Sequence, residues 1–314
     1  MKPHIIVTSK IIEAVIPVLE EHFTVHPYFD FSPDAREVPD DLKPLIKGIA
    51  TTAIPSGTTD AHFAALPNLE IVSHYGVGTD TVDLEAARNR GIIVTNTPNV
   101  LNEDVADMGV ILALSAIREV VKGDRFVRDG RWPKEIINLT RRVSELKVGI
   151  LGLGNIGRII AKRLEAFGMT IVYNDIKPVE GVSYEYYTDL LQMAKDVDVF
   201  FAMCPSLPST RGIISKEVIE AIGPKGLFVN IARGALVDEA EMVAALKDGR
   251  LGYAALDVFV SEPNVPAELF ELDNVILTPH TGSGTVETRR DIAQLTCDNL
   301  IRHFKGEPVL TPLW

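Results

Sequence analysis

The sequence predicts an α/β protein with two doubly wound parallel sheets, and three observations carry that prediction. Short apolar runs typical of buried strands alternate with stretches typical of helices. This alternation forms two series, one before and one after residues 97–99. The 314 residues are also enough for two ordinary domains, each with a core of its own.

The first series occupies residues 1–98. Its predicted strands are the apolar runs at residues 5–8, 48–51, 70–74 and 92–95. Helical stretches such as 11–21 and 59–66 separate them, as crossover helices separate parallel strands. Thr97-Pro98-Asn99 then predicts a domain boundary, because proline disfavours helix in the preceding residue and asparagine can cap a following helix.

A long helix and an irregular segment come next. Leu101, Val105, Met108 and Leu112 recur at helical spacing and predict an amphipathic core helix that runs to about residue 121. Residues 131–142, the arm, lose this periodicity and contain Trp132-Pro133. The arm is either a contact for a partner or a plain surface loop.

The second series predicts five or six parallel strands, enough for a complete doubly wound sheet. They lie at residues 147–151, 170–174, 197–202, 227–231, 253–257 and 275–277. The last helix, 285–304, has no strand after it, so we expect it to cross back onto the first domain. The prediction is therefore a discontinuous domain of residues 1–98 and 285–314, with a domain of residues 99–284 inserted into it.

Composition excludes several classes of function. A formal net charge of −12 opposes binding to nucleic acid. Apolar runs end well before the roughly 18 residues that a membrane span needs, and a strand-like run begins at once after Met1-Lys2-Pro3-His4, so we expect neither a span nor a signal peptide. Cys204 and Cys297 lack metal-type spacing, which favours free thiols in a reducing cytoplasm and no metal site.

A glycine turn at Gly152, Gly154 and Gly157 follows one predicted strand and opens a helix. In that context the first glycine permits a tight turn, the second lets a pyrophosphate approach the backbone, and the third lets helix and strand pack closely. The positive end of the helix then faces the phosphates. The residues around this turn thus predict a Rossmann-type dinucleotide site.

Asp175 directly follows the next predicted strand, 18 residues after Gly157. A carboxylate there can accept hydrogen bonds from the adenosine ribose and repels a 2′-phosphate, so NAD is favoured over NADP. Lys177 is the one nearby feature that argues the other way.

Three residues on later strand-end loops predict the chemistry. Arg233 follows the strand 227–231, and a guanidinium binds a carboxylate through two parallel hydrogen bonds. Glu262 and His280 follow the next two strands on the same edge of the sheet. Glu262 can therefore hold one nitrogen of His280 and leave the other to donate a proton.

These motifs resemble the D-isomer-specific 2-hydroxyacid dehydrogenase family over essentially the whole chain. The resembling segments are HYGVGTDTVD (74–83), VGILGLGNIG (148–157), VNIARGALVDE (229–239), LDVFVSEP (256–263) and PHTGSGTVETR (279–289). The last segment and Leu310-Thr311-Pro312 most resemble the glyoxylate, hydroxypyruvate and hydroxyphenylpyruvate reductase branch. This resemblance implies a Rossmann domain inserted into a flavodoxin-like substrate domain.

The resemblance also implies roles for single residues. Arg233 binds the carboxylate of a 2-oxo acid and polarises its carbonyl, Glu262 orients His280, and His280 gives the proton as hydride arrives from the nicotinamide. Backbone amides of Val77 and Gly78 reach the substrate, and Ile54 faces its side chain. Besides the three turn glycines, the cofactor-lining residues are Val105, Asn155, Ile156, Asp175, Cys204, Ile231, Asp257 and Gly282.

We therefore expect a cytoplasmic, NAD-dependent reductase of small 2-oxo acids, with hydroxypyruvate or glyoxylate first and an arylpyruvate second. NADP-preferring reductases of the branch carry an arginine-rich stretch where Asn174-Asp175-Ile176-Lys177 stands, so the likeness does not extend to cofactor choice. The family implies a homodimer, although periodicity alone also fits a monomer.

Two other functions fit the same fold. A nucleotide-sensing corepressor would keep the same three residues, but such proteins usually add a partner-capturing tail, and the sequence reaches Trp314 without one. A formate dehydrogenase is disfavoured, because that activity is associated with glutamine where Glu262 stands.

Overall fold

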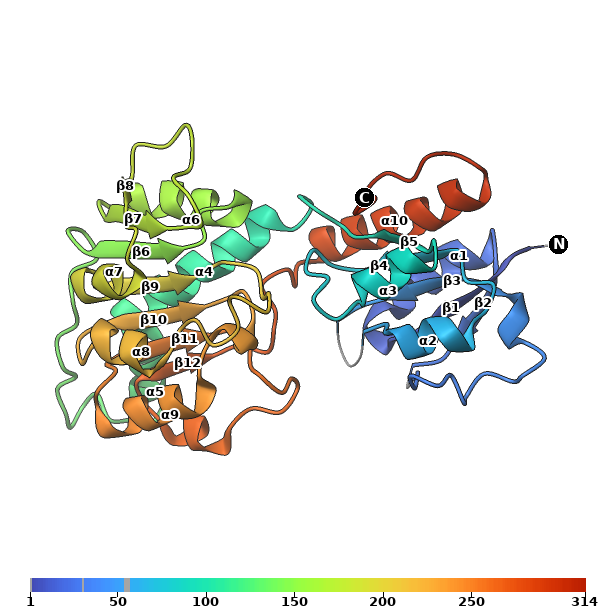
Figure 1. The fold of residues 1–314 in the computed structure, drawn as a ribbon. Helices are drawn as coiled ribbons and strands as arrows, with labels where there is room; N and C mark the ends of the chain where they lie inside the picture. Colours follow the sequence, from blue (N-terminus) through green and yellow to red (C-terminus); the bar gives the residue numbers. More distant parts are fainter. Residues whose placement is uncertain (1, 30, 54–56) are drawn as a thin grey trace. The chain divides into compact units, whose positions relative to one another are not determined.

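The computed structural model describes residues 2–29, 31–53 and 57–314. Contacts divide the chain into unit 1, Met1–Leu101 with Thr285–Trp314, and unit 2, Asn102–Gly284. Each unit is an α/β layer structure with helices packed on a parallel sheet (Figure 1). Each also has its own apolar core, with Phe63 among the largest buried side chains of unit 1 and Phe200 among those of unit 2.

The sheet of unit 1 has the strand order β2-β1-β3-β4-β5, with all neighbours parallel. The strands are β1 (His4–Val7), β2 (Thr24–Pro27), β3 (Ile46–Thr51), β4 (Ile71–His74) and β5 (Ile93–Thr95). This is the flavodoxin-like order. Ile5, Ile6 and Val7 are fully buried, as expected for a parallel strand covered on both faces.

Helix α10 (Val286–Phe304) packs on the strands of unit 1, although the whole of unit 2 separates it from them in the sequence (Figure 1). The hydroxyl of Ser73 in β4 donates to the carbonyl oxygen of Thr296 at 3.0 Å. The predicted discontinuous fold is therefore confirmed. The other helices of this unit are η1 (Lys10–Val15), α1 (Ile16–Glu20), η2 (Lys43–Leu45), α2 (Asp60–Ala65) and α3 (Leu84–Asn89).

The single helix predicted over residues 11–21 is wrong in detail. The structure has a 3₁₀ segment, η1, followed by the short α-helix α1, and Ile12 departs from helical dihedrals. Pro17 explains the break, because proline has no N–H and its ring clashes with the carbonyl four residues earlier in a continuous helix.

The described strands of unit 2 form a sheet in the order β12-β11-β10-β9-β6-β7-β8, again parallel throughout. They are β6 (Lys147–Leu151), β7 (Thr170–Asn174), β8 (Glu185–Tyr186), β9 (Val199–Ala202), β10 (Leu227–Asn230), β11 (Tyr253–Leu256) and β12 (Val275–Leu277). Within unit 2, the sequence analysis did not predict β8, whose two residues are too few to show a period. The order reverses between β6 and β9, which is where ligands bind in doubly wound folds.

The helices of unit 2 include α4 (Asn102–Ile117) and α5 (Val120–Arg128), where the sequence predicted one helix to about residue 121. Glu119, between them, has a left-handed φ of 48° that ends the first helix. The remaining helices are α6 (Asn155–Glu165), α7 (Leu190–Asp196), α8 (Lys216–Ile222), η3 (Gly234–Leu236), α9 (Glu239–Asp248) and η4 (Ala267–Glu271). In the part of the chain that is described, helices long and apolar enough to cross a membrane are absent.

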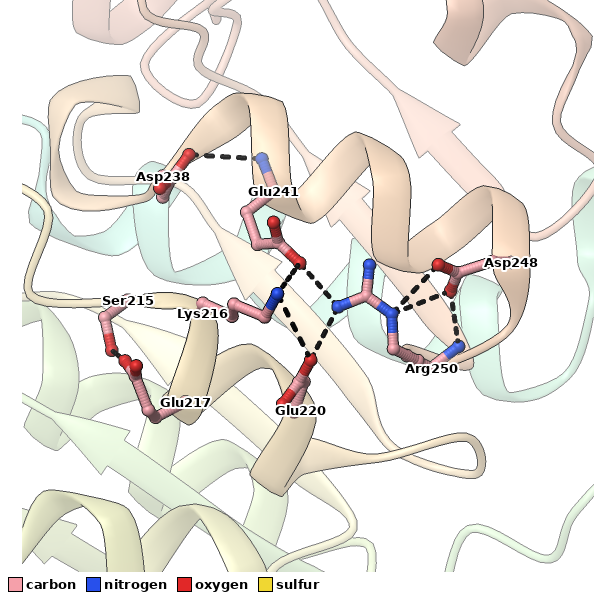
Figure 2. Close-up of polar contacts among 8 residues, drawn as sticks. All are labelled: Ser215, Lys216, Glu217, Glu220, Asp238, Glu241, Asp248 and Arg250. Atoms are coloured by element: carbon pink, nitrogen blue, oxygen red, sulfur yellow. Dashed lines mark hydrogen bonds and ion pairs between the residues drawn. The ribbon is translucent and has the colours of Figure 1, made fainter.

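A network of charges joins α8 to α9 (Figure 2). The guanidinium of Arg250 donates to Glu220 at 2.7 Å and to Asp248 at 2.9 Å, and it also pairs with Glu241. Lys216 lies within 4 Å of Glu220 and Glu241. At the other end of α9, the Asp238 carboxylate caps the helix by accepting from the Glu241 amide at 3.1 Å. Helix α9 is thus anchored at both ends.

Candidate active site

The glycine turn follows β6 at the point where the strand order reverses. Gly152 has a φ of +93°, and a Cβ on it would lie 2.7 Å from the backbone nitrogen of Cys204, which follows β9. A Cβ on Gly157 would lie 2.5 Å from the Gly152 oxygen. At Gly154, by contrast, a Cβ would meet no described atom within 4 Å. The turn is therefore closed toward the protein and open toward solvent, as a phosphate cradle must be.

Asp175 lies directly after β7 and is tied to the same turn. One carboxylate oxygen accepts from the Leu153 amide at 2.9 Å, and the other accepts from the Ile176 amide at 2.7 Å. The next two predicted cofactor residues, Asn155 and Ile156, begin helix α6. The Asp175 carboxylate, which is the group predicted to meet an adenosine ribose, is half-buried beside the turn.

Asp257, directly after β11, organises the loop that carries His280. Its side chain is buried and accepts from the Thr278 hydroxyl at 2.6 Å and from the amides of Thr281 and Gly282 at 2.8 Å each. A Cβ on Gly282 would lie 3.2 Å from this carboxylate and 3.5 Å from Val105 of α4. Three predicted cofactor residues, Val105, Asp257 and Gly282, are thus brought together.

His280 is held in a strained backbone conformation, with a φ of 52°. Such a conformation costs a non-glycine residue about 1–3 kcal/mol and persists only where the surroundings impose it. Here the His280 amide donates to the Asp257 carbonyl at 2.9 Å, while the residues on either side are bound by the Asp257 carboxylate.

The ring of His280 faces Glu262, with 2.6 Å between Nδ1 and Oε2. The other oxygen of Glu262 accepts from the Phe259 amide at 2.9 Å. Because Nδ1 is occupied in this way, Nε2 is the ring atom left to exchange a proton with a substrate. This arrangement is one in which a histidine can act as a general acid while a carboxylate orients its ring.

Burial of Glu262 acts to raise its pKa, but the hydrogen bond and charge of His280, the Phe259 amide and the charge of Arg233 outweigh it and lower the pKa below its ordinary 4.5. Glu262 is therefore ionised at neutral pH. A lowered pKa means that its contribution to stability is present above pH 4.5 and is lost as the pH falls through the lower, folded value.

Arg233 comes three residues after β10 ends, on the same edge of the sheet. Its guanidinium donates to the Ala232 carbonyl at 2.7 Å, and the Asn230 amide group holds the Arg233 carbonyl at 2.9 Å. The next residue, Gly234, packs so closely that a Cβ there would lie 2.1 Å from the Phe259 carbonyl carbon. The turn that carries Arg233 thus lies directly against the segment that orients Glu262.

The other predicted residues fall on strand ends of their own unit. Cys204 and Ile231 follow β9 and β10 and are buried. Val77 and Gly78 follow β4 in unit 1, where the Asn96 side chain donates to the Val77 carbonyl at 2.8 Å. Ile54 lies outside the described residues.

Sequence reasoning missed the residues that hold the loops in place. Thr278 and Thr281 bind the Asp257 carboxylate, and the Phe259 amide binds Glu262. The only signal in the sequence was that Thr278 directly follows a predicted strand. Hydrogen bonds between neighbouring loops produce no periodic pattern, so the sequence did not predict these contacts.

Comparison with known proteins decides the family. The family model for the NAD binding domain of D-isomer-specific 2-hydroxyacid dehydrogenases matches residues 110–282. Glyoxylate/hydroxypyruvate reductase A of Arabidopsis thaliana is 46% identical over 298 residues, which cover 94% of both chains. The chain belongs to the D-isomer-specific 2-hydroxyacid dehydrogenase family. It is therefore an oxidoreductase with a nicotinamide dinucleotide as its cofactor.

Two further relatives narrow the branch of this dehydrogenase family. Hydroxyphenylpyruvate reductase of Plectranthus scutellarioides is 49% identical over 249 residues, which cover 79% of this chain and 80% of the relative. The NADPH-dependent glyoxylate/hydroxypyruvate reductase of Sinorhizobium meliloti, solved in complex with NADP and malonate, superposes with a TM-score of 0.93 at 40% identity. That match covers 100% of this chain and 97% of the other. The resemblance seen in the sequence, including the reductase branch, is confirmed.

Proposed function

We propose that this dehydrogenase uses NADH to reduce hydroxypyruvate to D-glycerate, or glyoxylate to the achiral 2-hydroxy acid glycolate. The observation that carries the proposal is the 2.6 Å pair of Glu262 and His280 in the same unit as the glycine turn. Hydroxypyruvate and glyoxylate are named first because two similar proteins of this branch are named glyoxylate/hydroxypyruvate reductases.

In this proposal Arg233 binds the substrate carboxylate through its planar fork of N–H donors and polarises the adjacent carbonyl. Nε2 of His280 gives its proton to the carbonyl oxygen, while Glu262 holds Nδ1 and stabilises the imidazolium beforehand. The bound dinucleotide supplies the hydride. We further propose that the backbone amides of Val77 and Gly78 contact the substrate.

NADH is proposed over NADPH because of Asp175. Its carboxylate is fixed beside the glycine turn by the Leu153 amide, where it would repel the 2′-phosphate of NADPH. The Sinorhizobium meliloti relative is named as NADPH-dependent. The proposed preference for NADH therefore rests on Asp175 of this chain and not on that relative.

A substrate panel run with NADH and NADPH in parallel tests substrate and cofactor together. We expect kcat/KM with hydroxypyruvate or glyoxylate to be higher with NADH than with NADPH by about tenfold or more, and Asp175→Ser to narrow that ratio by about the same factor. Asp196→Ser, which removes an exposed carboxylate away from the turn, serves as the control. Equal use of both cofactors by the unmodified chain would refute the cofactor proposal.

The same panel separates the other candidates. The 49% identity to hydroxyphenylpyruvate reductase favours an arylpyruvate as the alternative substrate, so 4-hydroxyphenylpyruvate is included. A preference for it would replace hydroxypyruvate and glyoxylate in the proposal. Binding of NADH without turnover of any 2-oxo acid would favour the corepressor-like function, and reduction of NAD with formate would point to a formate dehydrogenase.

We also propose that two copies of this chain form a dimer through α4, α5 and the arm. This surface displays large apolar side chains, among which Trp132 is 71%, Ile136 96% and Leu139 99% exposed. The arm is nevertheless fixed at its end, since Arg141 pairs with Asp198 and donates to the Lys225 carbonyl at 2.9 Å. A fixed, apolar and exposed segment is the signature of an interface.

Light scattering of the unmodified chain is expected to give twice the mass of one chain. Leu139→Glu together with Ile136→Glu should shift the mass to that of a monomer, because a charge buried without a partner disfavours association. Glu135→Gln is the control, because it changes a polar residue of the same arm and leaves the apolar side chains in place. A monomer in the unmodified chain at micromolar concentration would contradict the proposal.

We propose a cytoplasmic location because both cysteines are free thiols. Cys204 and Cys297 are unpaired and buried. Burial raises the pKa of Cys204 to about 11 and that of Cys297 to about 12, so both remain thiols at neutral pH. Free thiols are typical of a reducing compartment.

A further inference from the structure

Glu239 is a second carboxylate that binds the segment beside the pair formed by Glu262 and His280. It is the first residue of α9, and its Oε1 accepts a hydrogen bond from the Val260 amide at 2.9 Å. The preceding amide, that of Phe259, donates to Oε1 of Glu262 at the same distance. Two consecutive peptide groups are therefore bound by two different carboxylates.

The segment between these carboxylates has little room to move. Gly234 packs against it so that a Cβ there would lie 2.1 Å from the Phe259 carbonyl carbon and 2.4 Å from the Val260 nitrogen. That contact limits movement toward the turn of Arg233, and the Glu239 carboxylate holds the Val260 amide. Helix α9 offers a fixed support, because Asp238 caps it and the Arg250 network anchors its far end (Figure 2).

We propose that Glu239 is a positioning residue for the general acid. By holding Val260 it fixes the Phe259 amide, which orients Glu262, and Glu262 in turn orients the ring of His280. Glu239 itself does not touch the reacting atoms. The groups that act directly on Glu262 are His280, the Phe259 amide and the charge of Arg233. This inference rests on the proposed roles of Glu262 and His280.

The test compares Glu239→Ala with Glu239→Gln. Alanine removes the acceptor for the Val260 amide, so kcat with hydroxypyruvate is expected to fall by about tenfold, a moderate penalty for a small misplacement of a catalytic group. In the alanine variant, kcat/KM should also begin to decrease at a lower pH than in the unmodified enzyme. The reason is that a looser contact between Glu262 and His280 stabilises the protonated ring less. Glutamine keeps an oxygen at the same place and should restore both quantities to within about twofold of the unmodified enzyme.

Asp248→Ala is the control for general loosening of α9, because it removes a carboxylate from the other end of the same helix. It should lower the melting temperature and leave the pH profile in place. A Glu239→Ala enzyme with an unshifted pH profile and a kcat within twofold of normal would overturn the inference, as would a Glu239→Gln enzyme as impaired as the alanine variant. If His280→Gln also turned over normally, the proposed function itself would fail and not only the role of Glu239.

Discussion

His280→Gln is expected to lower kcat for reduction of hydroxypyruvate by about a hundred- to ten-thousand-fold, the usual contribution of a positioned general acid. Glutamine fills a similar volume and can still hydrogen-bond, but it has no proton to give at neutral pH. The loss should fall on kcat and leave the affinity for NADH unchanged, since the glycine turn and Asp175 are separate from the ring. Steady-state kinetics and fluorescence titration with NADH measure the two effects.

The control for this variant is His303→Gln. His303 is also a partly buried histidine beside a glutamate, with its Nε2 3.1 Å from Glu70, but it lies on α10 in unit 1. Replacing His303 should leave kcat within about twofold of that of the unmodified enzyme, because His303 is not the proposed proton donor. Turnover of His280→Gln near that of the unmodified enzyme would mean that another group supplies the proton.

Arg233→Ala is expected to weaken the use of 2-oxo acids by about a hundredfold or more in kcat/KM. Hydrogen bonds to a charged group contribute about 1.5–3 kcal/mol each, and a bidentate guanidinium makes two of them to a carboxylate. Most of the loss should appear as a higher KM, because the carboxylate is bound in the ground state as well as during reaction. Kinetics over a wide range of hydroxypyruvate concentrations measure the split between KM and kcat.

Arg233→Lys separates the contribution of the positive charge from that of the planar guanidinium, because lysine keeps the charge and cannot form two parallel hydrogen bonds. Its KM should fall between those of the unmodified enzyme and the alanine variant. An unchanged KM in Arg233→Ala would show that a different cation holds the substrate carboxylate, and the assignment of Arg233 would then be wrong.

Much of the fold could be predicted because parallel strands leave strong local signals. Apolar runs such as the one before Gly152 identify buried strands, and the residue after each run then falls on one edge of the sheet. This reasoning put Glu262 and His280 on the same edge, and the structure places Nδ1 and Oε2 2.6 Å apart. Their catalytic roles remain predictions.

Other features lacked such a signal. The break between α4 and α5 depends on the left-handed backbone of Glu119, a conformation that no sequence period reveals. The hydrogen bond from the Val260 amide to Glu239 joins residues 21 apart through a backbone group, so it cannot be read from side-chain types. Likewise, Asp257 shapes the His280 loop through the Thr281 and Gly282 amides and not through a recognisable motif.

The most direct test is a crystal structure with NADH and oxamate, a 2-oxo acid analogue that is not reduced. Nε2 of His280 is expected within about 3 Å of the amide carbonyl oxygen of oxamate, with the guanidinium of Arg233 on its carboxylate. Oxamate bound away from both side chains, or His280 and Arg233 directed into separate crevices, would contradict the proposed chemistry even with the fold unchanged.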